Sequence, residues 1–117
     1  MEQRYGGDGI AAYAVHPGGI LTNLQRHMSR EDQIARGFID KDGVVTPRFK
    51  TPEQGAATSV WAAVAPELDG VNGRYLEDCH VAEAWSGEEP FSGYLPYALD
   101  PVAAERLWTV SADLAGF

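Results

Sequence analysis

The chain has 117 residues, enough for one small domain, and 44% of them are hydrophobic. Its net charge is −8, so it lacks the clustered cations that bind nucleic acids or anionic membrane surfaces. It has no apolar run near the roughly 20 residues that span a bilayer and no secretory signal at its N-terminus. The single cysteine, Cys79, excludes an intrachain disulfide, and we expect a cytoplasmic protein.

Residues 10–16 predict a strand buried on both faces, as in a parallel sheet, because this apolar run is short and is bounded by glycine and proline. The turn that follows, His-Pro-Gly-Gly, has two glycines that allow a backbone path a Cβ would block and that let a planar ring approach. A free backbone amide near Ile20 and the Thr22 hydroxyl would then be placed to bond a carboxamide. From the pattern alone, a simple strand-ending turn with a helix cap at Thr22 is favoured.

The next segment predicts two short helical pieces within residues 22–36. Thr22 or Asn23 caps the first piece and Ser29 caps the second, since each can accept a hydrogen bond from a free helix N–H. The apolar residues of segment 37–50 show neither helical nor strand periodicity.

The clearest predicted helix covers residues 51–66. Thr51 is its N-cap, Pro52 takes the first helical position and Gln54 completes a capping box. One buried face is expected from four apolar residues with helical spacing: Ala57, Val60, Trp61 and Val64.

Residues 74–79 predict a second strand, and the order strand, helix, strand predicts a crossover unit between parallel neighbours. Residues 85–99 form an irregular tail. A last helix over residues 100–115 begins at Asp100 and ends before Gly116. Its expected apolar face is Ala103, Leu107, Val110 and Leu114.

Three stretches together resemble the short-chain dehydrogenase/reductase family, in the right order. Residues 9–22 are similar to the family's sixth strand and cofactor loop. Residues 50–64, continuing to 73–79, are similar to the helix before the seventh strand and that strand. Residues 97–108 resemble the C-terminal helix of the branch like retinol dehydrogenases and the WW-domain oxidoreductase. The resemblance implies that residues 1–117 are the C-terminal part of an α/β domain with a Rossmann-like, doubly wound parallel sheet.

The same resemblance implies an NAD(P)-dependent oxidoreductase, which exchanges a hydride between an alcohol or carbonyl substrate and the nicotinamide of NAD or NADP. Residues 17–50 would form the cofactor loop and the substrate lid. The positions that match nicotinamide contacts are Pro17, Gly18, Ile20 and Thr22. The lid would include Leu24, His27 and Met28, with Phe38 and Phe49 as further lining; packing under a loop is an equal alternative for these residues.

The rest of the family's machinery is absent from this sequence. No tyrosine has a lysine four residues later, so the chain contains no tyrosine–lysine acid/base pair and no predicted catalytic residue. Residues 7–12 match the sequence pattern of a phosphate-binding glycine loop, G-x-G-x-x-A. They precede a strand instead of opening a helix, so the geometry for holding a pyrophosphate is wrong. The three histidines lack zinc-site spacing, so we predict no metal.

Three functional hypotheses follow. The first is the C-terminal segment of a short-chain oxidoreductase, inactive alone. It would either self-associate or need a complementary N-terminal segment, because two parallel strands leave both sheet edges unpaired. The second is a non-enzymatic interaction or regulatory remnant, and the third is one half of a split enzyme. The preference between NAD and NADP is not readable from these residues.

Overall fold

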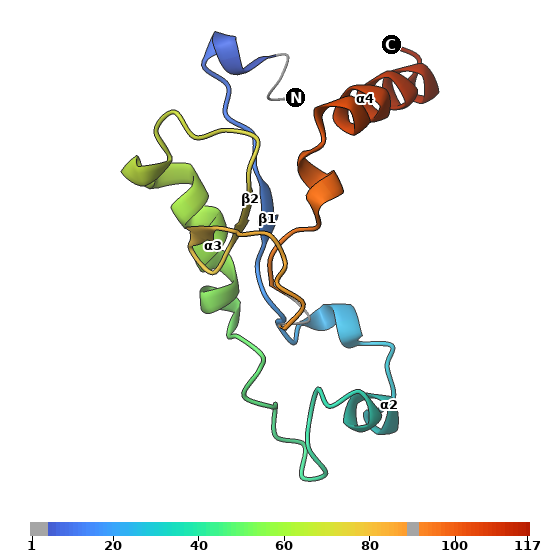
Figure 1. Cartoon of the computed structure of the whole chain (residues 1–117). Coiled ribbons are helices and arrows are strands. Elements are labelled where there is room, and N and C mark those ends of the chain that lie inside the picture. Colours follow the sequence, from blue (N-terminus) through green and yellow to red (C-terminus); the bar gives the residue numbers. More distant parts are fainter. Residues whose placement is uncertain (1–4, 89–91) are drawn as a thin grey trace.

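The computed structural model describes residues 5–88 and 92–117 (Figure 1); the expected irregular tail therefore lies partly outside the described residues. The sheet has three strands in the order β1-β2-β3: β1 (Ala14–His16), β2 (Tyr75–Glu77) and β3 (His80–Val81). The α-helices are α2 (Arg30–Ala35), α3 (Pro52–Val64) and α4 (Pro101–Ala115), and four short 3-10 turns are η1 (Gly6–Asp8), η2 (Asn23–Gln25), η3 (Pro66–Leu68) and η4 (Pro96–Leu99).

The predicted parallel pair is confirmed. β1 and β2 run parallel with Val15 opposite Leu76, and α3 connects them. Helix α3 lies against one face of this pair (Figure 1), where Leu76 is fully buried. The Tyr13 hydroxyl donates to the carbonyl of Val71 (2.7 Å) and so joins the start of β1 to the loop that leads into β2.

Strand β3 was not predicted. It pairs antiparallel with β2 through a two-residue turn at Asp78 and Cys79, both of which have positive φ (45° and 57°). This is the backbone of a tight hairpin turn, which normally takes Asn-Gly or Asp-Gly. The expectation of two unpaired sheet edges is therefore wrong on the β2 side, and β1 is left as the edge strand beside it.

The predicted helix ends are confirmed by their caps. The Thr51 hydroxyl accepts the Gln54 N–H and the Gln54 side chain accepts the Thr51 N–H, as in a capping box. The Asp100 carboxylate accepts two N–H groups of the first turn of α4, and Gly116 ends that helix with φ 77°. These ends were predictable because capping depends on neighbours in sequence.

The burial expected for two elements is wrong. The 10–16 run is not buried on both faces: Ile10 is 46% exposed, and only Ala14–His16 form a strand. On α3 the buried residues are Gly55 and Thr58 instead of the apolar stripe, whose Val64 is 72% exposed. The physical reason is that nothing in the described part of the chain packs against those surfaces.

The core is small for a chain of this length. Within residues 5–88 and 92–117, the buried apolar side chains are Ile39, Leu68, Leu76 and Ala82. The radius of gyration is 17.7 Å, whereas a compact domain of this size has about 13 Å. The accessible surface is 8722 Å², about 2,500 Å² more than a compact monomer of this mass exposes. The architecture is α/β with a mixed sheet; the doubly wound sheet stays a prediction.

In the described part of the chain, no helix is long and apolar enough to cross a bilayer.

Candidate functional site

The loop Pro17–Ile20 follows directly on the carboxyl end of β1, as predicted. Gly18 has φ +90°, a backbone conformation that strongly favours glycine. A Cβ built on Gly18 would lie 2.8 Å from Cδ of Lys50, and one on Gly19 would lie 3.4 Å from the ring of Phe49. The space beside both glycines is thus filled by Lys50 and Phe49, so on that side a planar ring could approach only if those side chains moved.

Ile20 combines an anchored side chain with an open backbone donor. Its side chain packs against Gly55 of α3, where a Cβ would come within 2.6 Å of Ile20 Cγ1. Within the described residues the Ile20 N–H donates to no acceptor. The free amide that the sequence suggested near this position is therefore present.

Thr22 acts as a helix cap, the simpler of the two interpretations. Its hydroxyl oxygen accepts the Leu24 N–H (3.2 Å), and the side chain of Gln25 accepts the Thr22 N–H (2.9 Å). Because the hydroxyl only accepts in this contact, its proton is still available to a ligand.

A groove of about 440 Å³ opens beside the loop and is called here the loop groove. Its lining residues are His16, Gly18, Gly19, Arg48, Lys50, Glu77, Asp78 and Ser92. The structure thus brings Gly18 into the groove wall, while Pro17, Ile20 and Thr22 are not part of it. The charged residues of the wall were missed by sequence reasoning, because they come from segments 28 or more residues away from the loop.

The predicted lid residues do not line the loop groove. Leu24 is 80% exposed, His27 is exposed, and Met28 is half-buried with its carbonyl bonded to the Gln33 side chain (3.3 Å). Their position leaves Leu24 and His27 accessible from solvent.

Phe38 and Phe49 pack against each other edge to face, with ring centroids 5.1 Å apart. The Arg48 guanidinium lies 5.2 Å from the Phe49 ring and 5.8 Å from the Phe38 ring, a cation–π arrangement. Its Nη2 also donates to the Arg36 carbonyl (2.7 Å). These contacts match packing under a loop, the alternative that the sequence left open.

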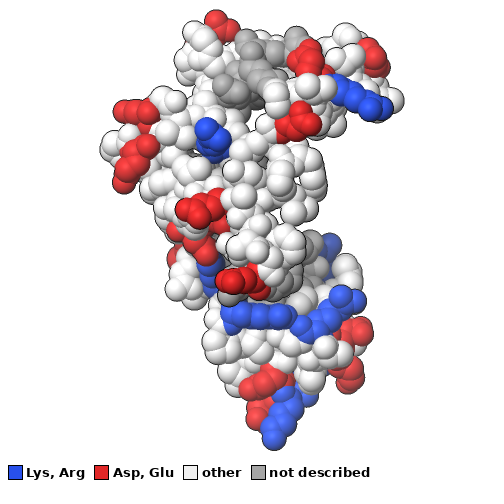
Figure 2. Space-filling view, in the orientation of Figure 1, with Lys and Arg blue, Asp and Glu red and all other residues white. Residues whose placement is uncertain are grey.

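The basic residues are concentrated in the segment that the sequence predicts as the lid. Six of the nine lysines and arginines fall within residues 26–50, against four of the seventeen acidic residues. Figure 2 shows this as Lys and Arg gathered over the lower part of the molecule, whereas acidic residues predominate above it. Residues 26–50 are thus locally cationic on a strongly acidic chain.

Two carboxylates at the end of β2 have different surroundings. Glu77 is 4% exposed and accepts hydrogen bonds from the Ser92 hydroxyl (3.0 Å) and the Gly93 N–H (2.8 Å). Asp78 is exposed and pairs with Lys50, and the hydrogen bond from Lys50 holds the pKa of the Asp78 carboxyl below its usual value.

Tyr75, which lies on β2 beside these groups, has a pKa shifted away from neutral pH. Burial, with a smaller contribution from Glu77, raises the pKa of Tyr75. An acid/base tyrosine needs the opposite shift, toward neutral pH. In the described part of the chain, no group of three or more potential ligands is placed to hold a metal ion.

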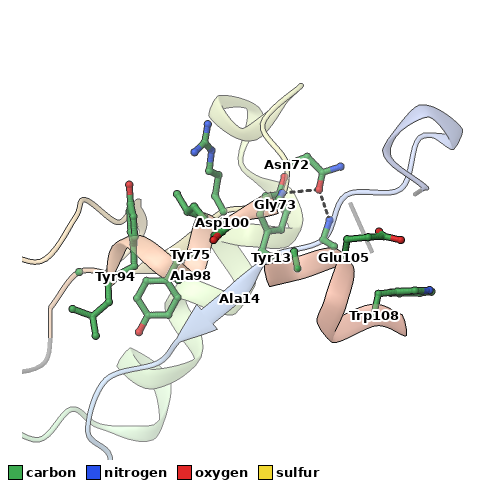
Figure 3. Close-up of a pocket in the computed structure, with 16 residues that line it drawn as sticks. Tyr13, Ala14, Asn72, Gly73, Tyr75, Tyr94, Ala98, Asp100, Glu105 and Trp108 are labelled. Atoms are coloured by element: carbon green, nitrogen blue, oxygen red, sulfur yellow. Dashed lines mark hydrogen bonds between the residues drawn. The ribbon is translucent and has the colours of Figure 1, made fainter. Parts of the chain in front are cut away.

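A second groove, of about 690 Å³, lies between the sheet and α4 and is called here the α4 groove (Figure 3). The Asn72 side-chain oxygen ties its floor together by accepting the N–H groups of Ala12 (2.7 Å) and Gly73 (2.8 Å). Tyr75 and Tyr94 lie on one side of it, and Trp108 of α4 lies on the other.

The sequence is similar to known oxidoreductases along nearly all of its length. It is 50% identical over 114 residues to a "Probable oxidoreductase" of Streptomyces lividans, a match that covers 95% of this chain and 38% of that protein. It is 38% identical to the "Short-chain dehydrogenase/reductase prx1" of Penicillium roqueforti, covering 97% and 33%. It is 34% identical to "Retinol dehydrogenase 14" of Mus musculus, covering 99% and 31%.

The chain therefore spans only about a third of the length of these relatives. No family model and no solved structure matches it. Similarity that covers 95–99% of the chain, to relatives that share one type of name, confirms the resemblance read from the three motifs. Along nearly all of its length the chain is thus similar to members of the short-chain dehydrogenase/reductase family, and it matches about one third of such an enzyme.

Proposed function

We propose that this chain supplies the nicotinamide-side loop and the substrate lid of an NAD(P)-dependent short-chain oxidoreductase. The observation that carries the proposal is the Ile20 N–H, which has no acceptor within the described residues and stands at the carboxyl end of a parallel strand pair. This edge of an open α/β sheet is where ligands bind.

The residues present fit the nicotinamide end of such a cofactor. The Ile20 N–H and the Thr22 hydroxyl are two donors for a carboxamide, and Pro17 and Gly18 direct the backbone between β1 and Ile20. Leu24, His27 and Met28 belong to the segment that would cover the substrate. The cofactor would supply the hydride acceptor or donor for an alcohol or carbonyl substrate.

The acid/base group must come from elsewhere. The sequence holds no tyrosine with a lysine four residues on, and the pKa of Tyr75 is raised instead of lowered. We therefore propose that the chain is inactive alone and works with a complementary N-terminal segment.

The geometry offers that segment two places to bind. β1 is the edge strand beside β2, so its outer backbone groups are open to a further strand. The α4 groove lies next to it, lined by the start of β1 and by α4 (Figure 3). Association with such a segment would cover part of the accessible surface, which exceeds that of a compact monomer by about 2,500 Å².

The test is reconstitution. The 117-residue chain is mixed or co-expressed with the N-terminal two thirds of the Streptomyces lividans relative, and NADH and NADPH binding is followed by nucleotide fluorescence. Turnover is then measured on a panel of alcohols and aldehydes. We expect a complex that binds nucleotide and turns over, whereas neither part alone does.

A matched pair of variants makes the test specific. Thr22→Val removes the hydroxyl at the proposed site. Thr109→Val removes a hydroxyl at an exposed position of α4. We expect the first to weaken nucleotide binding about 2- to 13-fold, as for one lost hydrogen bond, and the second to leave it unchanged. A complex without nucleotide affinity would instead favour an interaction module, and turnover by the chain alone would contradict the proposal.

A further inference from the structure

Lys50 touches every residue of the loop that leaves β1. Its backbone N–H donates to the Gly19 carbonyl (2.8 Å), and it forms a parallel bridge with Ile20. Its ammonium group donates to the Pro17 carbonyl (3.5 Å) and to the carboxylate of Asp78. One residue at the end of the lid is thus bonded to the loop at several points.

The aliphatic part of Lys50 lies over Gly18. A Cβ on Gly18 would come within 2.8 Å of both Cδ and Cε of Lys50 and within 2.9 Å of Nζ. The lysine side chain therefore fills the place that a side chain of residue 18 would otherwise take. Its path from the lid to Asp78 runs directly across the loop, and its length is needed to make the crossing.

Asp78 is anchored to the body of the domain. It stands in the turn between β2 and β3, and the next residue, Cys79, donates its N–H to the hydroxyl of Thr58 (3.3 Å). Thr58 is 1% exposed on α3. The turn that carries this carboxylate is consequently held by the sheet on one side and by α3 on the other.

The charges around this pair favour its ionised form. Lys50, His80 and His16 all lower the pKa of Asp78, with the hydrogen bond from Lys50 as the largest cause. The neighbouring Glu77 is bonded to Ser92 and Gly93, so it does not compete for the ammonium. The side chain of Lys50 is 28% exposed and that of Asp78 is 65% exposed, so the pair is open to water on the carboxylate side.

From this geometry we propose that Lys50 and Asp78 are positioning residues: their ion pair clamps the loop Pro17–Ile20 in the shape that presents the Ile20 N–H to the nicotinamide. The ligand of the loop is taken from the proposed function, whereas the clamp follows from the contacts of Lys50 alone. In this proposal Lys50 and Asp78 act through the backbone of the loop and not through contact with the cofactor.

The first arm of the test measures the clamp in the 117-residue chain without nucleotide. Amide hydrogen exchange and chemical shifts of residues 18–20 and 50 are recorded for Lys50→Met, Asp78→Asn and the double variant. Methionine keeps the stem over Gly18, and asparagine tolerates the left-handed turn, so both variants retain the local packing. We expect exchange of the residue 50 amide to rise about two- to five-fold, as for a partly exposed ion pair.

The controls separate the clamp from a general loss of charge. Lys41→Met and Asp69→Asn remove the same charges at exposed positions and should leave the loop unchanged. The double variant should resemble each single variant, because each single change already breaks the same ion pair. Lys50→Arg keeps the positive charge and should retain slow exchange. Unchanged exchange in Lys50→Met, or effects of the two single changes that simply add, would overturn the clamp.

The second arm uses the reconstituted complex. There Lys50→Met and Asp78→Asn should raise KM for the nucleotide two- to five-fold with little change in kcat, because the loop only orients a binding donor. A complex that binds no nucleotide at all would refute the proposed function while the first arm still decides the clamp. Altered exchange with unaltered KM would refute the link between the clamp and the cofactor.

Discussion

Replacing Gly55 with alanine tests whether α3 sets the position of Ile20. The new Cβ would lie 2.6 Å from Cγ1 and 2.7 Å from Cδ1 of Ile20. Carbon atoms in contact normally stay about 3.5–4.0 Å apart, so the isoleucine would have to retreat by roughly 1 Å. Because its backbone carries the open N–H, the displacement would reach the proposed cofactor contact.

The size of the effect follows from two opposing contributions. Alanine in place of glycine inside a helix stabilises by about 0.5–1 kcal/mol. Forcing a methyl group into occupied space costs about 1–3 kcal/mol. We therefore expect Gly55→Ala to lower the free energy of unfolding by about 1 kcal/mol, even though the substitution favours the helix.

Urea unfolding followed by tryptophan fluorescence measures this change, and the amide shift of Ile20 reports the displacement. Ser59→Ala on the exposed side of the same helix is the control and should stay within about 0.5 kcal/mol of the parent. Combining Gly55→Ala with Ile20→Ala should cost less than the sum of the two single changes. If Gly55→Ala proved as stable as the control and left the Ile20 amide unmoved, the packing argument would be refuted.

Three further predictions concern the helix cap, the core and acid pH. Asp100→Ala removes the cap of α4 and should cost about 1 kcal/mol, seen as lower helicity by circular dichroism. Leu76→Ala should cost about 2–5 kcal/mol, whereas Leu107→Ala, at a residue 68% exposed, should be nearly neutral in the same urea titration. Since Lys50 lowers the pKa of Asp78, their pair stabilises the fold above the ordinary aspartate pKa; this stabilisation is lost as pH falls through the lowered value. Asp78→Asn should remove that part of the acid dependence.

The elements that sequence predicted correctly depend on near neighbours. The caps at Thr51 and Asp100 use side chains that bond N–H groups two or three residues on, so the motif alone is sufficient. The parallel pairing of β1 and β2 also followed from the order of elements. The same local logic predicted the cap at Thr22 and an open amide near Ile20, whereas the role of both residues as donors to a cofactor stays a prediction.

The elements that sequence missed depend on distant partners. The contacts of Lys50 with Pro17 and Asp78 join residues 33 and 28 positions apart, and no periodicity signals them. The β2–β3 turn was missed because Asp-Cys is not a usual hairpin dipeptide. Burial was misjudged on α3 for a different reason: Val64 is apolar, but the described chain provides nothing to cover it.

The turn at Cys79 has a practical consequence for experiments on this protein. The only thiol of the chain is exposed and stands at φ 57°, where a side chain costs about 1–2 kcal/mol relative to glycine. A Cys79→Gly substitution would thus remove the reactive group and relax the backbone together, and the N–H to Thr58 would be kept. Because the Cys79→Gly variant cannot form disulfide-linked dimers on exposure to air, any dimer that it forms is held by non-covalent contacts.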